Sequence, residues 1–502
     1  MDPINLFLWL IFLPLGAAPI IYLSGKISSN QTKGTLLARW VALSVLTATA
    51  FLLLLVSQIV NTTGPITLEI ESIALKMDGI GLIVAFVALA LGILSTIFSF
   101  PYMKKERSEE KYYAMLTAMI GTMIGLGCAA DLFNLWIWFE AMALTSFLLV
   151  AFYRNQKGSL EAGYKYIVQS AVGSVFVILG ISFVFMQTGE LDLAAISAAI
   201  SGPDPLLITA GAFFLIGFGV KSALVPLHTW LPDAHSQSPS AISAMLSGIV
   251  IEAGLIALLR SLGCLSNTMQ NWGVILLGFG ALNILVGNLM ALRQKEVKRL
   301  LAYSSVAQMG YMLLGFGVAI SYPTALQAGE GAFFHLINHA VLKGLAFLAA
   351  GVMLYVLHLA NGNHKALVNE DLNGISRKYP LVAFVFSVAV LGLSGLPPMA
   401  IFMSKWQIFT AAIQTQDMMI LSLVVFAALN SVLSLGYYAP LVNRIYRYEP
   451  SPIIENGKPA SAAMTIPLII LTLASVAMGV WPTLTSWLTN PAASSLMTIF
   501  GN

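Results

Sequence analysis

Six charged residues of this chain lie in segments that are otherwise apolar enough to cross a membrane. A charge at membrane depth costs at least ~2.5–3.5 kcal/mol, so such a residue is expected to serve a function. Two histidines accompany them in the same kind of segment. Together they predict a path that moves protons or small cations. The charged residues are Glu140, Lys165, Lys221, Glu252, Lys343 and Lys405, and the histidines are His335 and His339.

The composition indicates a polytopic membrane protein. Of the 502 residues, 58% are hydrophobic and 9% are charged, whereas soluble domains carry about 25% charged residues. The basic residues behind the net charge of +3 lie in short loops, which argues against a nucleic-acid-binding face. Cys128 and Cys264 predict neither a disulfide framework nor a metal site. The first apolar run lacks the features of a cleaved signal peptide, so we expect it to remain as a helix.

Apolar runs of about 20 residues predict 14 membrane-spanning helices. The loops after odd-numbered helices hold 19 of the 25 lysines and arginines, and the loops after even-numbered helices hold only Lys76 and Arg260. By the positive-inside rule, the first set of loops faces the cytoplasm and both termini lie outside. The predicted spans are residues 4–24, 37–60, 79–102, 112–130, 132–153, 164–187, 205–231, 239–263, 271–292, 300–320, 328–358, 380–414, 418–442 and 463–487.

Two spans contain a break next to a lysine. Pro226 follows Lys221 in the seventh span, and Pro397-Pro398 precedes Lys405 in the twelfth. Proline removes a backbone donor, and a membrane tolerates such a break only where protein or water satisfies the freed groups. Two interrupted helices five spans apart indicate an inverted-repeat transporter.

The domain organisation follows from these breaks. Residues 66–77 alternate like a short strand on the outer face, and residues 190–200 predict a short surface helix. We predict an all-α fold with helices 1–3 in residues 1–110, five-helix repeats in residues 111–265 and 266–447, and helix 14 in residues 448–502.

Glu140 and Lys221 carry opposite charges and have no partner nearby in sequence. We expect them to lie close together and to act as one proton site. A structural ion pair is the alternative for Glu140. Snorkelling to the interface is the alternative for Lys221, although Lys221 lies about 24 Å along a helix from the start of its span.

His335, His339 and Lys343 form a helical stripe about 12 Å long, a spacing that suits proton relay through waters. A metal site is one alternative for the histidines, but no third ligand with suitable spacing is visible; a core role for one histidine is another. Lys405 is the counterpart of Lys221 and a candidate for the exit side. Polar residues inside other spans either hold waters or pack helices together: Gln169, Ser170, Ser304, Ser305 and Gln308.

The chain has no nucleotide-binding loop, no CxxC cluster and no haem-attachment motif. We therefore expect no cofactor and no ATP or redox chemistry of its own. The energy for transport must come from an ion gradient or from a partner subunit.

Three segments resemble the antiporter-like subunits of respiratory complex I, a superfamily that includes Mrp-type Na⁺/H⁺ antiporter subunits and membrane-bound hydrogenase subunits. They are Lys221-Ser-Ala-Leu-Val-Pro-Leu-His228-Thr-Trp-Leu-Pro-Asp233-Ala-His235, Lys298-Arg-Leu-Leu-Ala-Tyr-Ser-Ser305 with Gln308-Met-Gly-Tyr, and His335-Leu-Ile-Asn-His339-Ala-Val-Leu-Lys343. The resemblance covers roughly residues 70–450. It implies 14 helices with inverted repeats and a central hydrophilic axis.

By this resemblance Glu140 matches the fifth-helix glutamate and Lys221 the seventh-helix lysine. The histidines match the eleventh-helix motif, and Lys405 matches the twelfth-helix lysine or glutamate. Two positions depart from the family: Glu252 replaces the usual eighth-helix lysine, and Gln308 replaces a frequent histidine. A carboxylate at position 252 alters the standard relay and also suits Na⁺, a hard cation. The predicted pathway comprises Glu140, Lys165, Lys221, His228, Glu252, Gln308, His335, His339, Lys343 and Lys405.

We predict an ion-translocating membrane subunit that moves protons and belongs to a complex I-like, redox-driven pump, an NADH/quinone- or ferredoxin-type oxidoreductase. Its expected partners are homologous and small membrane subunits, the lipid bilayer and H⁺ or Na⁺. The expected location is a prokaryotic inner membrane or an energy-transducing organelle membrane. About 15 residues follow the last span, so we expect no long lateral helix as in the largest complex I subunit. The alternatives are an Mrp-type subunit, a hydrogenase subunit, a stand-alone carrier and a non-conducting structural subunit.

Overall fold

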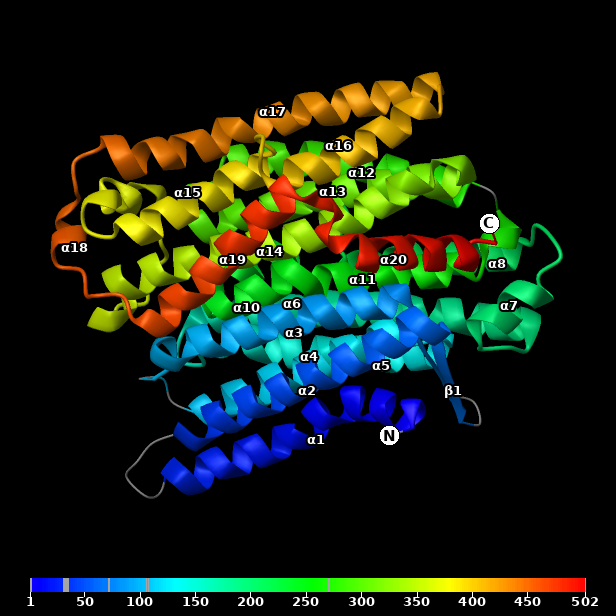
Figure 1. Cartoon of the computed structure of the whole chain (residues 1–502), viewed down its shortest axis with the longest axis horizontal. Coiled ribbons are helices and arrows are strands. Elements are labelled where there is room, and N and C mark those ends of the chain that lie inside the picture. Colours follow the sequence, from blue (N-terminus) through cyan, green and yellow to red (C-terminus); the bar gives the residue numbers. More distant parts are fainter. Residues whose placement is uncertain are drawn as a thin grey trace.

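The computed structural model describes residues 2–29, 36–70, 73–104, 106, 108–269 and 271–501. In these residues the chain is almost wholly helical, and the long helices run side by side along one direction (Figure 1). Three of the 19 basic loop residues, Lys33, Lys105 and Arg107, lie outside the described residues.

The first half of the chain contains α1 (Pro3–Ser29), α2 (Leu36–Thr63), β1 (Ile66–Ile70), β2 (Ile73–Met77), α3 (Gly79–Tyr102), α4 (Glu109–Cys128), α5 (Leu132–Val150), α6 (Lys157–Thr188), α7 (Leu193–Ala199), α8 (Pro205–Lys221), α9 (Trp230–Gln237), α10 (Ser240–Met245), the π-helical turn η1 (Leu246–Val250) and α11 (Ile251–Gly263). The second half contains α12 (Trp272–Leu292), α13 (Val297–Ser321), α14 (Leu326–Leu357), α15 (Pro380–Ser394), α16 (Ala400–Gln414), α17 (Met418–Arg447), α18 (Pro452–Glu455), α19 (Ala462–Val480) and α20 (Ser486–Ile499). Short 3₁₀ turns are Ser266–Thr268, Pro323–Ala325, Leu359–Asn361, Asn369–Leu372, Ile375–Arg377 and Pro482–Thr485.

Each of the 14 predicted spans corresponds to a helix or a broken helix, which confirms the predicted fold class. Eleven helices of the described residues are long and apolar enough to cross a membrane. The seventh span is α8 with α9, the twelfth is α15 with α16, and the fourth is α4, whose first turn is charged. The boundaries of the two five-helix repeats stay a prediction.

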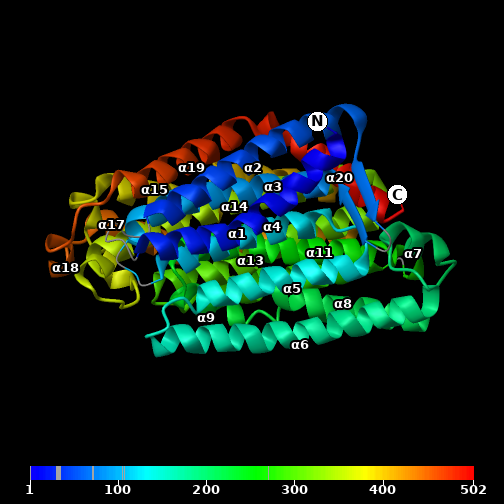
Figure 2. The same cartoon turned by 90° about the horizontal axis from the view of Figure 1, so that it is seen from below.

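Both termini lie at the same end of the bundle, as an even number of spans requires (Figures 1 and 2). The β1–β2 hairpin and α7 lie at this end, which we call the terminal face. The predicted strand at 66–77 is thus an antiparallel hairpin in which Ile66 pairs with Met77, and the predicted helix at 190–200 is α7. The opposite end, which we call the basic face, carries α18 and the connections after odd-numbered spans.

The last predicted span, 463–487, differs at its end. Helix α19 stops at Val480 because Pro482 cannot continue the backbone hydrogen bonding. The chain then resumes as α20, which packs against α3 and α14. Within the described residues three spans are therefore interrupted, whereas the sequence predicts two.

The break between α8 and α9 is satisfied by a side chain from far along the chain. Asn283 of α12 accepts a hydrogen bond from the Val225 amide at 2.8 Å and donates to the Ala223 carbonyl at 3.1 Å. The Trp230 indole donates to the Val220 carbonyl at 2.7 Å. These contacts supply the partners that a backbone break inside a membrane requires.

Buried side chains satisfy the break between α15 and α16 in the same way. Gln308 of α13 donates to the Leu393 carbonyl at 2.8 Å, and Asn338 of α14 donates to the Ala400 carbonyl at 2.8 Å. Helix α13 itself packs closely on α12, because a Cβ on Gly310 would lie only 2.5 Å from the α12 backbone.

Arg260 was assigned to an outer loop by the sequence, and the structure corrects that assignment. Its side chain is buried in α11 and forms an ion pair with Asp78 at 2.8 Å. Asp78 also caps the N-terminus of α3 by accepting from the Gly81 amide. A buried cation of this kind has a partner from another helix, which local sequence does not reveal.

Candidate ion-conducting axis

Lys221 is buried at the last residue of α8. Its ammonium donates a hydrogen bond to the Tyr166 hydroxyl of α6 and lies 5.9 Å from the centroid of the Phe139 ring. Glu140, the next residue of α5, interacts electrostatically with Lys221. Among the described residues no direct ion pair joins the two, and one carboxylate oxygen of Glu140 is buried without a hydrogen-bond partner. The structure thus makes them neighbours, while their joint role stays a prediction.

Glu252 of α11 lies against the histidine motif of α14. Its carboxylate contacts Nδ1 of His339 at 2.7 Å, and both side chains are fully buried. The other carboxylate oxygen and the other ring nitrogen have no partner within the described part of the chain. A Cβ on Gly254 would lie 2.9 Å from Cβ of Lys221, so α11 also packs directly on the end of α8. Helix α11 therefore lies between Lys221 and the histidine stripe, and the Glu252 carboxylate is on its stripe side.

His335 connects the stripe to the second break. One ring nitrogen lies 2.9 Å from the Ser404 hydroxyl and the other lies 3.0 Å from the Gln308 side-chain oxygen. Lys405 follows Ser404 in α16 and is also buried. Its ammonium donates to the Ser431 hydroxyl at 2.9 Å and lies 4.0 Å from the centroid of the Tyr311 ring. Three of the predicted residues, Gln308, His335 and Lys405, thus lie around the second break.

Lys343 lies one helical turn beyond His339 on α14. Its buried ammonium donates to the Leu301 carbonyl at 2.7 Å and to the Ser304 hydroxyl. The Tyr438 hydroxyl donates to the same serine at 2.7 Å. Each titratable group of the stripe therefore has different polar neighbours on the surrounding helices.

Lys165 and His228 lie outside this buried line. The Lys165 side chain is 48% exposed and pairs with Glu161 at 2.7 Å and with Asp233 at 3.0 Å. These contacts are those of a structural ion pair near a surface. His228 lies between α8 and α9, with its ring 6.1 Å from that of Tyr303 and with Nδ1 unpartnered within the described residues.

Two buried groups, His235 and Lys298, were not among the site residues predicted from the sequence. His235 of α9 stacks on Phe347 with ring centroids 4.6 Å apart, and neither ring nitrogen has a partner in the described segments. It interacts electrostatically with Lys298 and Lys343. The sequence placed Lys298 in a basic loop, but its side chain is buried and donates to the Ser238 carbonyl at 2.5 Å. Both residues lie in the motifs that carry the family resemblance, which was the available signal.

The helices and the buried charges define a polytopic membrane protein with a charged axis through its centre. A family described as "NADH:quinone oxidoreductase/Mrp antiporter, TM" matches residues 129–431. The chain belongs to this family, and it is an antiporter-like, ion-translocating membrane subunit of the complex I and Mrp superfamily.

Relatives and solved structures agree with this assignment. F(420)H(2) dehydrogenase subunit N of Methanosarcina mazei is 32% identical over 92% of this chain and 93% of its own length. A chain of the membrane-bound sulfane sulfur reductase, an archaeal respiratory membrane complex, superimposes with a TM-score of 0.87 at 26% identity, over 99% of both chains. A chain of respiratory complex I from Thermus thermophilus superimposes with a TM-score of 0.75 at 26% identity, over 94% of this chain and 98% of that one.

Proposed function

We propose that this chain conducts protons across the membrane as one subunit of a complex I-like, redox-driven assembly. The observation that carries the proposal is the contact of Glu252 with His339 at 2.7 Å in the centre of the bundle. It supports a line of titratable groups from Glu140 and Lys221 through the stripe of α14 to Lys405. Each group of such a line holds a proton in turn and passes it on through waters.

The environment of Glu252 favours H⁺ over Na⁺ as the moving ion. A hard cation prefers several oxygen ligands, whereas the neighbour of this carboxylate is an imidazole. Within the described residues no group of three or more histidine, cysteine, aspartate or glutamate side chains is arranged to hold a metal ion. An imidazole is instead a good proton donor and acceptor.

The relatives support an assembly with partner subunits. Two proteins of known structure that this chain resembles are parts of respiratory membrane complexes, and we propose that this chain likewise works with other membrane subunits. Exposed apolar side chains on the outer helices support contact with lipid or with such partners: Trp9, Trp40, Phe51, Phe185, Leu429, Val432 and Leu473.

Proton conduction without sodium is the expected result for the intact complex. The complex is purified through an affinity tag on this chain and reconstituted in liposomes that contain the pH dye pyranine. A potassium diffusion potential, set with valinomycin, should drive proton flux in Na⁺-free buffer, and adding Na⁺ should leave the rate unchanged. Flux that requires Na⁺ would reject the proton assignment, and purification of the chain without partners would reject the assembly.

Both termini are expected on the outer side of the membrane, because the basic face carries most lysines and arginines. Thr498→Cys probes the terminal face and Asn456→Cys probes the basic face; both positions are exposed. The background replaces Cys128 and Cys264, which are buried. In intact cells a membrane-impermeant maleimide should label the first variant and spare the second. Labelling of Asn456→Cys alone would reverse the orientation.

A further inference from the structure

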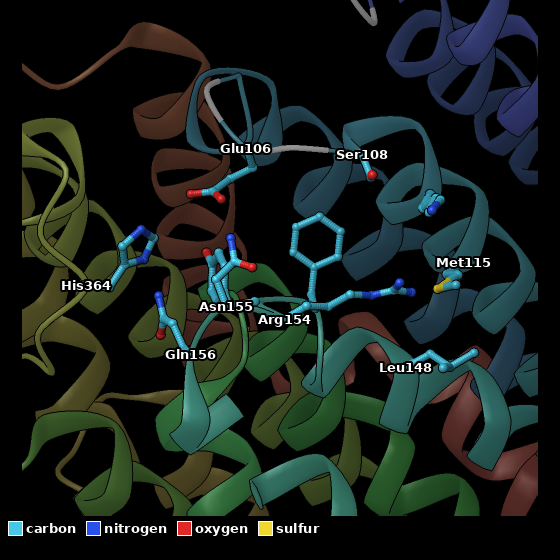
Figure 3. A pocket seen from close by; sticks show the side chains of 11 residues that line it. Glu106, Ser108, Met115, Leu148, Arg154, Asn155, Gln156 and His364 are labelled. Atoms are coloured by element: carbon cyan, nitrogen blue, oxygen red, sulfur yellow. The ribbon is translucent and has the colours of Figure 1, made fainter. Parts of the chain in front are cut away.

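A partly open pocket of about 490 Å³ lies at the basic face, away from the axis described above. It is formed by the connection after α3, the start of α4, the end of α5 and the segment that follows α14 (Figure 3). The family resemblance assigns no role to its residues. The charged and titratable side chains that line it are Glu106, Lys111, Tyr153, Arg154 and His364.

Glu106 and His364 come from distant parts of the chain and lie on the same side of this pocket (Figure 3). The two side chains interact electrostatically. The rings of His364 and Tyr153 pack edge to face, with centroids 5.3 Å apart. Arg154 extends toward Met115 and away from the carboxylate and the imidazole (Figure 3). The pocket therefore holds an acid and a base side by side, where water reaches both.

Partial burial raises the pKa of the Glu106 carboxyl above its ordinary value, and the charge of His364 lowers it by a smaller amount. A carboxyl in this position holds a proton at a higher pH than an exposed one does. Tyr102 and Tyr153 are the other titratable groups that its charge reaches.

The inner wall of the pocket leads toward the buried lysine of α13. Tyr153, Gln156 and His364 also line a second cavity of about 40 Å³, and Ser238 and Lys298 line the same cavity. A polar cavity of this size has room for a water molecule. The buried ammonium of Lys298 donates to the Ser238 carbonyl at 2.5 Å. Water in the pocket is thus separated from Lys298 by one small polar cavity.

Lys298 in turn is coupled to the axis. It interacts electrostatically with His235, and His235 interacts with Lys343 and His339. The Ser238 and Ser243 hydroxyls lie 2.9 Å apart, and Ser243 donates to the His235 carbonyl at 3.1 Å. Hydrogen bonds therefore extend from Lys298 to the backbone of His235, and an electrostatic interaction couples the His235 ring to the histidine stripe of α14.

We propose that the pocket of Glu106 and His364 is the mouth through which protons from the basic face reach the axis. A hydronium ion in the pocket gives its proton to the Glu106 carboxylate and becomes water, and the carboxyl passes the proton to the neutral imidazole of His364. The ammonium of Lys298 releases a proton toward His235, and the resulting amine takes up the proton of His364 through water in the small polar cavity. This inference rests on the proposed function, because it adds the uptake site of the same proton path.

The test compares Glu106→Gln with Glu106→Asp in the reconstituted complex, with flux read by the pyranine assay. A positioned side chain speeds proton transfer by about 10²-fold or more. Because waters take over part of the role of an uptake group, we expect the flux of Glu106→Gln to be roughly tenfold slower. Glu106→Asp, which keeps the carboxylate, should restore most of the rate. Glu455→Gln is the matched control, because Glu455 is an exposed carboxylate of the basic face outside the pocket.

The outcomes separate this inference from the proposed function. Normal flux in Glu106→Gln, together with lost flux in a Lys221 variant, would refute the pocket as the proton-uptake site and leave the proposed function unaffected. Normal flux in both would overturn the function itself. If Glu106→Gln does not assemble with its partners, His364→Gln decides instead: a slowed flux supports the mouth and a normal flux overturns it.

Discussion

Replacing Glu252 by glutamine should reduce proton flux by about 10²-fold, the typical value of a positioned proton-transfer group. The amide has nearly the shape of the carboxylate and still accepts a hydrogen bond from His339, but it does not bind and release a proton. The complex should therefore assemble normally and fail to conduct. The measurement is the initial rate of internal pH change in proteoliposomes, with Glu455→Gln as the control.

Glu252→Lys restores the residue that the family usually has, yet we expect it to lose flux as well. Its ammonium would replace the carboxylate that contacts His339, a residue that already interacts with the charge of Lys343, and like charges in a poorly solvated place repel strongly. Full transport by the glutamine variant would mean that Glu252 serves packing or pairing, and would favour a non-conducting structural subunit.

Replacing Lys221 by methionine should also reduce flux by roughly 10²-fold, because the thioether fills the volume of the lysine stem and carries no proton. It should also lower the thermal stability of the purified complex, since Glu140 loses its nearby positive charge. The two residues form no direct ion pair, so the loss should be smaller than the roughly 3–5 kcal/mol that breaking a buried pair costs.

The double variant Lys221→Met with Glu140→Gln separates the two effects. It removes both charges, so thermal stability should recover toward that of the unmodified complex while flux stays low. If thermal stability does not recover in the double variant, Lys221 stabilises the bundle through Tyr166 and Phe139 alone. Unchanged flux in both single variants would refute the coupled site.

The spanning helices and two of the three breaks were predictable from the sequence because their causes are local. A run of about 20 apolar residues, or a proline within one, acts through the backbone of the same segment. Glu140, Lys221 and Lys405 were equally visible, because a charge within an apolar run is costly wherever the helix packs. Helix α20 was not predicted, since its polar residues leave no apolar run of the required length.

Partners between helices were not predictable from one sequence. The contact of Glu252 with His339 joins residues 87 positions apart, and no pattern in either segment predicts this contact. Lys298 looked like a loop cation because it stands at the start of α13, next to Arg299 and Lys295. Its burial depends on α9 and the small polar cavity beside it, and these become visible only when the helices are packed.

The side chain of Asn283 makes the two predicted repeats inseparable as folding modules. It belongs to the second repeat, yet it supplies the hydrogen bonds for the opened backbone of the first. A fragment that stops after α11 would leave those backbone groups facing hydrocarbon, where each unsatisfied group costs several kcal/mol. We therefore expect that neither predicted repeat can be exchanged for a homologous half unless the hydrogen bonds of this asparagine are restored across the boundary.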